Sequence, residues 1–104
     1  MALRQKGESK RVSKTLTVLN PLGLHVRPAA QFVRCVQQYR SEVILISNDT
    51  RYEAGRLMDI LMANLDLGAV FTIEADGPDA ELVVQSLEHL LVELQREEEA
   101  EGKS

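Results

Sequence analysis

The chain has 104 residues, of which 44% are hydrophobic and 27% are charged, a composition typical of one globular domain. Its formal net charge of −4 argues against sequence-independent binding to nucleic acid, which requires a basic surface. The single cysteine, Cys35, rules out an internal disulfide, as is usual in a reducing compartment. No apolar run approaches the roughly 20 residues of a membrane span, and the first residues lack the apolar core of a signal peptide. We therefore expect a cytoplasmic protein without membrane insertion.

Hydrophobic periodicity predicts four strands and three helices. Strands are indicated where β-branched residues alternate with polar ones, and helices where apolar residues recur every three or four positions. In chain order, the predicted elements are a strand at 15–19, a helix at 28–39, strands at 42–47 and 51–53, a helix at 56–65, a strand at 70–75 and a helix at 80–97. Half-polar strands and half-apolar helices can cover one another in two layers. The pattern predicts an α+β fold, β-α-β-β-α-β-α, with one antiparallel sheet covered on one face by three helices.

The two ends of the chain differ in charge from the region between them. Residues 1–13 are basic and aperiodic, so we expect a flexible arm there. Residues 96–104 hold four glutamates against one arginine and one lysine, so we expect an acidic, solvated tail after a single folded domain at 14–95. The alternative, that the tails dock partners or attract each other, stays open at this point.

One stretch combines a histidine, an arginine and a proline in a way that indicates a reactive site. His25 can act as a nucleophile near neutral pH. Pro28 suits the first turn of a helix, where free N–H groups and the helix dipole attract anions. Arg27 lies two residues after the histidine and has donors that match a phosphate. Gly23 is typical of a turn, and Asn20 can hydrogen-bond across the loop. Together these residues indicate an imidazole that can carry a phosphoryl group.

Residues 23–30 read Gly-Leu-His-Val-Arg-Pro-Ala-Ala and resemble the phosphorylation-site motif of the HPr family, the histidine-containing phosphocarriers of the bacterial phosphoenolpyruvate-dependent sugar phosphotransferase system. The resemblance covers residues 14–94. It implies an open-faced sandwich with strand order 1-4-2-3. It also implies that enzyme I phosphorylates His25 on Nδ1 and that the group then passes to a histidine of an enzyme IIA domain. In such a protein Arg27 interacts with the phosphoryl group and with partner carboxylates, and Asn20 supports the loop.

The helix predicted at 56–65 has more apolar surface than one buried stripe needs. The resemblance implies that this helix docks enzyme I and IIA domains. Leu57, Met58 and Leu61 are then the expected contact residues, unless they belong to the core. Arg56 occupies the position at which many members of the family carry a regulatory serine, so we expect that second, ATP-dependent phosphorylation to be absent.

The first hypothesis is a monomeric relay protein in sugar uptake, without metal or cofactor, rather than a stand-alone enzyme. The second is a regulatory adaptor of a nitrogen-type phosphotransferase branch, which would signal through His25 phosphorylation without moving sugar. A third, an interaction domain with a vestigial histidine, is disfavoured by the intact Arg27 and Pro28.

Cys35 is expected to pack rather than react, because it lies at no helix start. The second histidine, His89, is expected to be a solvated helix residue.

Overall fold

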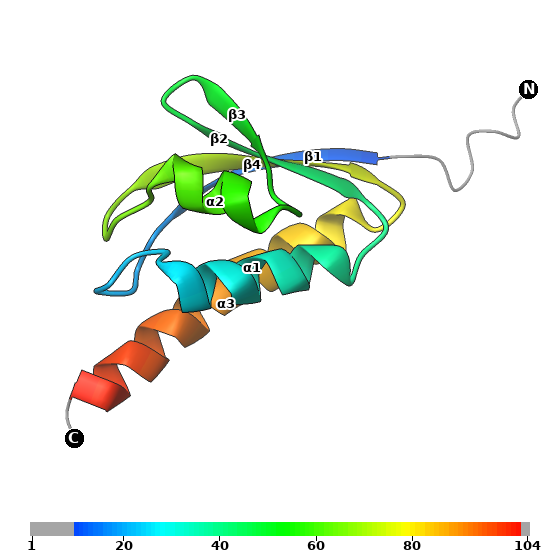
Figure 1. Cartoon of the computed structure of the whole chain (residues 1–104). Coiled ribbons are helices and arrows are strands. Elements are labelled where there is room, and N and C mark those ends of the chain that lie inside the picture. Colours follow the sequence, from blue (N-terminus) through cyan, green and yellow to red (C-terminus); the bar gives the residue numbers. More distant parts are fainter. Residues whose placement is uncertain (1–9, 103–104) are drawn as a thin grey trace, which may run out of the picture.

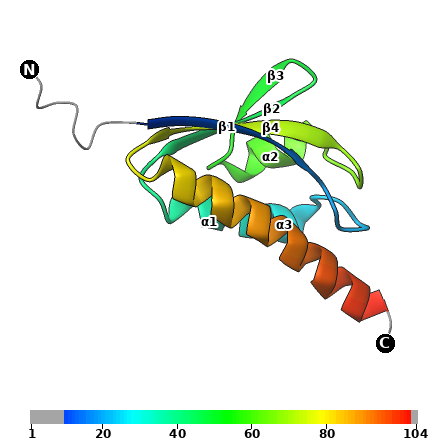
Figure 2. The same cartoon turned by 180° about the vertical axis from the view of Figure 1, so that it is seen from behind.

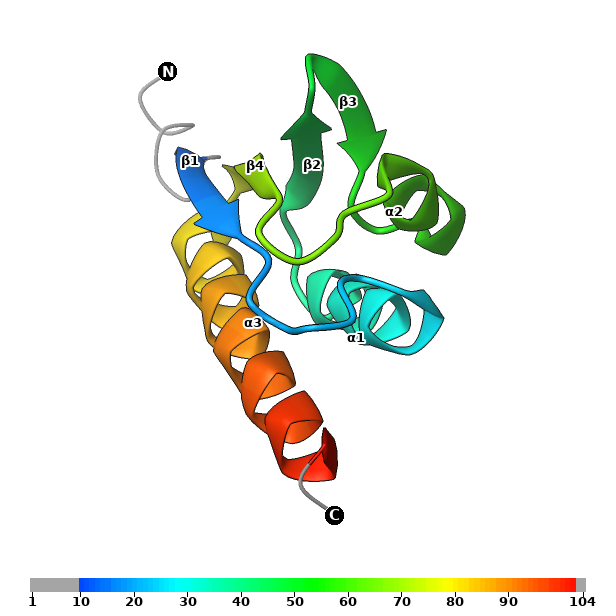
Figure 3. The same ribbon diagram turned by 90° about the vertical axis from the view of Figure 1, so that its left-hand side faces the viewer.

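The computed structural model describes residues 10–102, and its backbone confirms the predicted order of elements. The elements are β1 (Lys10–Thr17), α1 (Val26–Gln37), β2 (Glu42–Ser47), β3 (Thr50–Glu53), α2 (Leu57–Ala63), β4 (Val70–Gly77) and α3 (Ala80–Gly102) (Figure 1). The four strands form one antiparallel sheet in the order β1-β4-β2-β3, as the resemblance implied. All three helices lie on one face of this sheet and leave the other face open (Figure 3).

The core lies between the sheet and the helices. Along the central strand β4, every second residue is buried, so that Phe71, Ile73 and Ala75 face the helices as predicted. Phe32 of α1 meets Phe71 edge to face, with ring centroids 6.3 Å apart. Fully burying an apolar side chain of this size contributes about 1.5–3 kcal/mol relative to leaving it in water. This packing holds α1 against the sheet.

The start of β1 differs from the prediction. The strand begins at Lys10 rather than at residue 15, because residues 10–13 pair with residues 74–77 of β4. These four residues were expected in the flexible arm. Their side chains are mostly exposed, and this explains why their polar sequence gave no strand pattern. Residues 1–9 of the expected arm lie outside the described part of the chain.

The end of α3 also differs from the prediction. The helix continues to Gly102 and so includes most of the segment 96–104 that was expected as a tail; residues 103 and 104 are not described. Its last turns project past the sheet and run beside the loop that joins β1 to α1 (Figure 2). Glu98, which was expected in the solvated tail, is buried there, and its carboxylate accepts hydrogen bonds from the loop. Among residues 10–102, no helix is both long and apolar enough to cross a membrane.

Candidate active site at the start of α1

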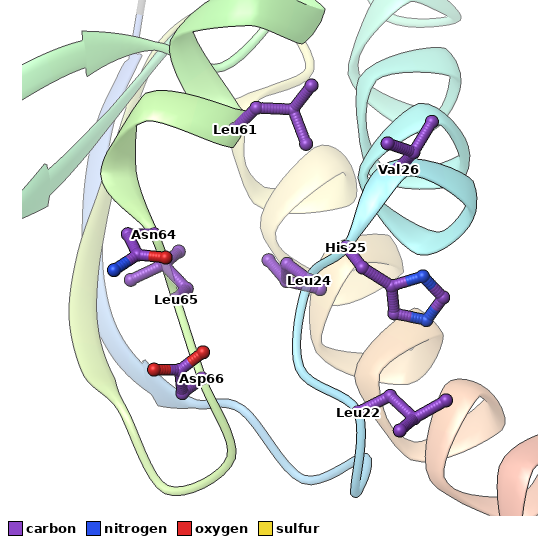
Figure 4. Close-up of a pocket in the computed structure, with 8 residues that line it drawn as sticks. All are labelled: Leu22, Leu24, His25, Val26, Leu61, Asn64, Leu65 and Asp66. Carbon is purple, nitrogen blue, oxygen red and sulfur yellow. The ribbon is translucent and has the colours of Figure 1, made fainter.

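His25 lies immediately before α1, at its N-cap position. Its backbone is extended, with φ −78° and ψ −173°, and its carbonyl accepts the first helical hydrogen bond, from the Ala29 N–H, at 2.8 Å. The imidazole does not cap the helix, and its side chain is 40% exposed. Figure 4 shows the ring pointing away from Asn64, Leu65 and Asp66. The side chain is therefore open to an incoming reactant.

The first turn of α1, which directly follows His25, begins with free amides. Within residues 10–102, the backbone N–H groups of Val26 and Arg27 have no hydrogen-bond partner. Pro28, the next residue, is buried in the first turn and has no N–H to satisfy. Free amides at the positive end of a helix dipole form an anion-binding site.

The loop that leads to His25, which we call the β1–α1 loop (residues 18–25), is held by hydrogen bonds. Gly23 has a φ of +74°, and its N–H donates to the Asn20 carbonyl at 3.0 Å, which closes the expected turn. Asn20 is fully buried, and its Nδ2 donates at 2.8 Å to the carbonyl of Gly23. The Leu24 N–H donates to the carbonyl of Leu65 at 2.8 Å. The loop is thus attached both to itself and to the segment after α2.

A buried carboxylate that we did not predict completes the loop. Glu98 of α3 is 8% exposed, and its Oε1 accepts the Leu22 N–H at 2.8 Å. Its Oε2 accepts Nδ2 of Asn20 at 2.8 Å and lies 3.5 Å from Nε2 of His25. The signal was present in the sequence, because Glu98 continues the buried helical stripe of α3 four residues after Leu94.

The hydrogen bonds around Glu98 determine its charge. Burial alone raises the pKa of Glu98. The hydrogen bonds from the Leu22 amide and the Asn20 side chain, together with His25, outweigh burial and hold the pKa below its ordinary value of 4.5. Glu98 is therefore a carboxylate at neutral pH, and it can only accept hydrogen bonds.

Arg27 is exposed in the first turn of α1, and α3 provides its partner. Its guanidinium nitrogen Nη2 lies 3.2 Å from Oε2 and 3.4 Å from Oε1 of Glu101. The two side chains are 61% and 56% exposed, so this ion pair contributes at most about 1 kcal/mol. Arg27 can accordingly exchange Glu101 for another anion at small cost.

The three residues expected to dock partners differ in exposure. Met58 is 65% exposed, whereas Leu57 and Leu61 are partly buried against the core. Leu61 and His25 also line one shallow pocket between α1 and the end of α2 (Figure 4). Further exposed apolar side chains, which we did not predict as contact residues, belong to the β1–α1 loop, α1 and α2: Leu22, Val26 and Met62. Of these, Leu22 and Val26 line the same pocket as His25.

The other two residues singled out in the sequence lie away from this site. Cys35 is half-buried in α1 and packs against the core, and burial raises the pKa of its thiol. His89 is exposed in α3, with its Nε2 3.6 Å from Oε2 of Glu93. Neither residue contributes to the arrangement around His25.

Comparison with known proteins agrees with this geometry. Residues 12–93 match the family model described as "PTS HPr component phosphorylation site". The phosphocarrier protein HPr of Buchnera aphidicola is 36% identical over 75 residues, which are 72% of this chain and 88% of that protein. HPr of Haemophilus influenzae is 37% identical over 79 residues, 76% of this chain and 89% of that protein. The crystal structure of HPr from Bacillus anthracis superposes with a TM-score of 0.75 at 28% identity and covers 77% of this chain and 95% of its own. The motif, the sheet order and these matches lead to one conclusion: the chain belongs to the HPr family of phosphocarrier proteins of the phosphotransferase system.

Proposed function

We propose that the chain accepts a phosphoryl group from phosphoenolpyruvate-charged enzyme I on Nδ1 of His25 and delivers it to a histidine of an enzyme IIA domain during sugar uptake. It works as a cytoplasmic monomer that meets each partner in a transient complex. Membership of the HPr family supports this proposal, since the matched family model is described as a phosphorylation site.

One observation carries the proposal. The imidazole of His25 is exposed at the N-cap of α1, and the amides of the two residues that follow it lack partners within residues 10–102. In phosphoryl transfer, negative charge is spread over three oxygens while the attacking and leaving atoms lie in line. The free amides, the positive end of α1 and the Arg27 guanidinium can together bind these oxygens.

The surface around His25 suits a short-lived complex. Leu22 and Val26 are exposed and line one pocket with His25 and the partly buried Leu61. Met58 and Met62 of α2 are exposed as well. An apolar patch of this kind, beside a reactive group, marks a contact surface for other proteins. We include Leu57 in the contact surface as well. The exposed Arg56 at the start of α2 has no hydroxyl group, so the proposal includes no regulatory phosphorylation at that position.

Incubation with enzyme I and phosphoenolpyruvate labelled on phosphorus tests the proposal. We expect one acid-labile, base-stable label per chain. His25→Ala should abolish it, because the substitution removes the imidazole at the N-cap of α1. The matched control is His89→Ala, which removes an exposed histidine of α3 and should leave labelling unchanged.

The onward step separates the two roles weighed in the sequence. Transfer of the label to a sugar-specific IIA domain supports the proposal. Transfer only to a nitrogen-type IIA domain would instead show the regulatory adaptor. A wild-type chain that takes no label, or a His25→Ala variant that still does, would contradict the proposal altogether.

A further inference from the structure

Glu98 contacts the proposed nucleophile from outside the region that the family model matches. That match ends at residue 93, whereas α3 continues to Gly102. Oε2 of the buried Glu98 lies 3.5 Å from Nε2 of His25. A carboxylate beside one nitrogen of a reactive imidazole selects the tautomer of the ring and stabilises charge that develops on it.

We propose that Glu98 is a positioning residue whose carboxylate accepts a hydrogen bond from Nε2–H of His25 and so leaves the lone pair at Nδ1 free to attack phosphorus. The inference rests on the proposed function, because it concerns the same histidine.

The carboxylate of Glu98 is held in place by other groups. The Leu22 N–H donates to Oε1 and Nδ2 of Asn20 donates to Oε2, each at 2.8 Å. Because an ionised carboxylate has no proton to donate, it makes a favourable contact with Nε2 only when Nε2 carries the proton. The separation of 3.5 Å is long, as is common in proteins whose partner has not yet bound.

The same contact disfavours phosphorylation of Nε2, the other ring nitrogen of His25. A phosphoryl group on Nε2 would have to occupy the space that the Glu98 carboxylate fills. It would also bring about 1.5 to 2 negative charges against a buried negative charge. A phosphoryl group on Nδ1 is bonded to the nitrogen that Glu98 does not contact. Attraction at one nitrogen and repulsion at the other therefore select the same reaction site.

The transfer step balances with Glu98 in this role. The lone pair of Nδ1 forms the new bond to phosphorus, while the bond from phosphorus to the donor group of enzyme I breaks and its electron pair stays with that donor group. The proton on Nε2 does not move. The His25 ring gains positive charge, and the carboxylate of Glu98 faces it. Delivery to the next histidine is the reverse process, and the ring returns to its starting tautomer.

The ring nitrogens of His25 report this arrangement directly. Nitrogen-15 NMR at about pH 8, where an ordinary imidazole is neutral, distinguishes the Nε2–H from the Nδ1–H tautomer. We expect the Nε2–H form to dominate in the wild-type chain. In Glu98→Gln the ratio of Nε2–H to Nδ1–H should fall about threefold to tenfold, the effect of losing one typical hydrogen bond. The initial rate of labelling by enzyme I should fall by roughly tenfold with it.

Glu97→Gln is the matched control, because it makes the same charge change at an exposed neighbouring position of α3. We expect it to leave the tautomer ratio and the labelling rate within about twofold of wild type. The amide resonances of Leu22 and Leu24 check that the β1–α1 loop stays folded in both variants.

Three results would overturn the inference. One is a wild-type ring that is mainly Nδ1–H, which needs no variant to measure. Another is a Glu98→Gln variant with an unchanged tautomer ratio and rate. The third is a slower rate with an unchanged tautomer ratio, which would mean that Glu98 only anchors the loop. A wild-type chain that takes no label would contradict the proposed function instead. If wild type is labelled but Glu98→Gln leaves the tautomer ratio unchanged, only the role of Glu98 is contradicted.

Discussion

At the scale of single residues, the conformation of one glycine brings His25 into position. A Cβ at Gly23 would lie 2.8 Å from the carbonyl oxygen of Leu65 and 3.0 Å from Cα of Asp66. Its φ of +74° is, in addition, one that side chains rarely adopt. The β1–α1 loop can approach the segment after α2 this closely only with glycine here. Because His25 follows two residues later, a shift of this contact would move the imidazole.

Gly23→Ala should therefore lower the free energy of unfolding by about 2–4 kcal/mol, since it adds a backbone clash to the strain of a positive φ. Gly68→Ala is a matched control, because Gly68 has a φ of +86° but a Cβ added there would meet nothing within 4 Å. It should lose only about 1 kcal/mol, the cost of the positive φ. Urea unfolding at neutral pH measures both variants. Equal losses in the two would contradict the steric explanation.

At the scale of elements, the type and place of a helix or strand can be predicted where its own residues carry the hydrophobic pattern of that element. The alternation in β4 and the apolar stripe of α3 gave the type and order of the elements, and the motif around His25 gave the candidate nucleophile. The start of β1 and the hydrogen-bond partners of Glu98 could not be predicted in this way, because distant contacts determine them. The carboxylate of Glu98 accepts hydrogen bonds from Leu22 and Asn20, which lie 76 and 78 residues away in the chain. Nothing close to Glu98 in the sequence indicates those partners.

The last turns of α3 should therefore affect the loop more than the core. A chain that ends at residue 95 retains Leu87, Leu91 and Leu94, which are buried in the core, and loses Glu98. We expect it to fold, with a free energy of unfolding about 2 kcal/mol lower, because the Leu22 amide and the Asn20 side chain lose a charged acceptor. Hydrogen exchange at the Leu22 amide should become at least about tenfold faster.

A chain that ends at residue 102 serves as the control for this truncation and should match the full-length chain in both measurements. Unchanged exchange at Leu22 in the shorter chain would mean that the last turns of α3 do not hold the loop.

At the scale of the whole molecule, two hydrogen-bonded carboxylates attach α3 at its two ends. Asp79, immediately before the helix, accepts the Arg40 N–H at 2.9 Å and the Ser41 hydroxyl at 2.7 Å. These two hydrogen bonds lower the pKa of Asp79 from its ordinary value of 3.8. Near the other end, Glu98 holds the β1–α1 loop in the same way. The ion pairs between β1 and α3, such as Lys14 with Glu88, are about half exposed and contribute less.

This arrangement predicts how stability depends on pH. The folded pKa values of Asp79 and Glu98 are both lowered, so their contributions are complete above the ordinary values of 3.8 and 4.5 and are lost as the pH falls through the lower folded values. We expect the free energy of unfolding, measured in urea, to decrease steadily from about pH 5 to pH 3.

Glu98→Gln should be about 1–3 kcal/mol less stable than wild type at pH 7 and should show a shallower decrease, because the variant has no carboxylate to protonate at this position. Glu97→Gln should follow the wild-type curve, since Glu97 is exposed. If the free energy of unfolding fell equally in Glu98→Gln and wild type between pH 5 and pH 3, protonation of the Glu98 carboxylate would not be a cause of the loss of stability in acid.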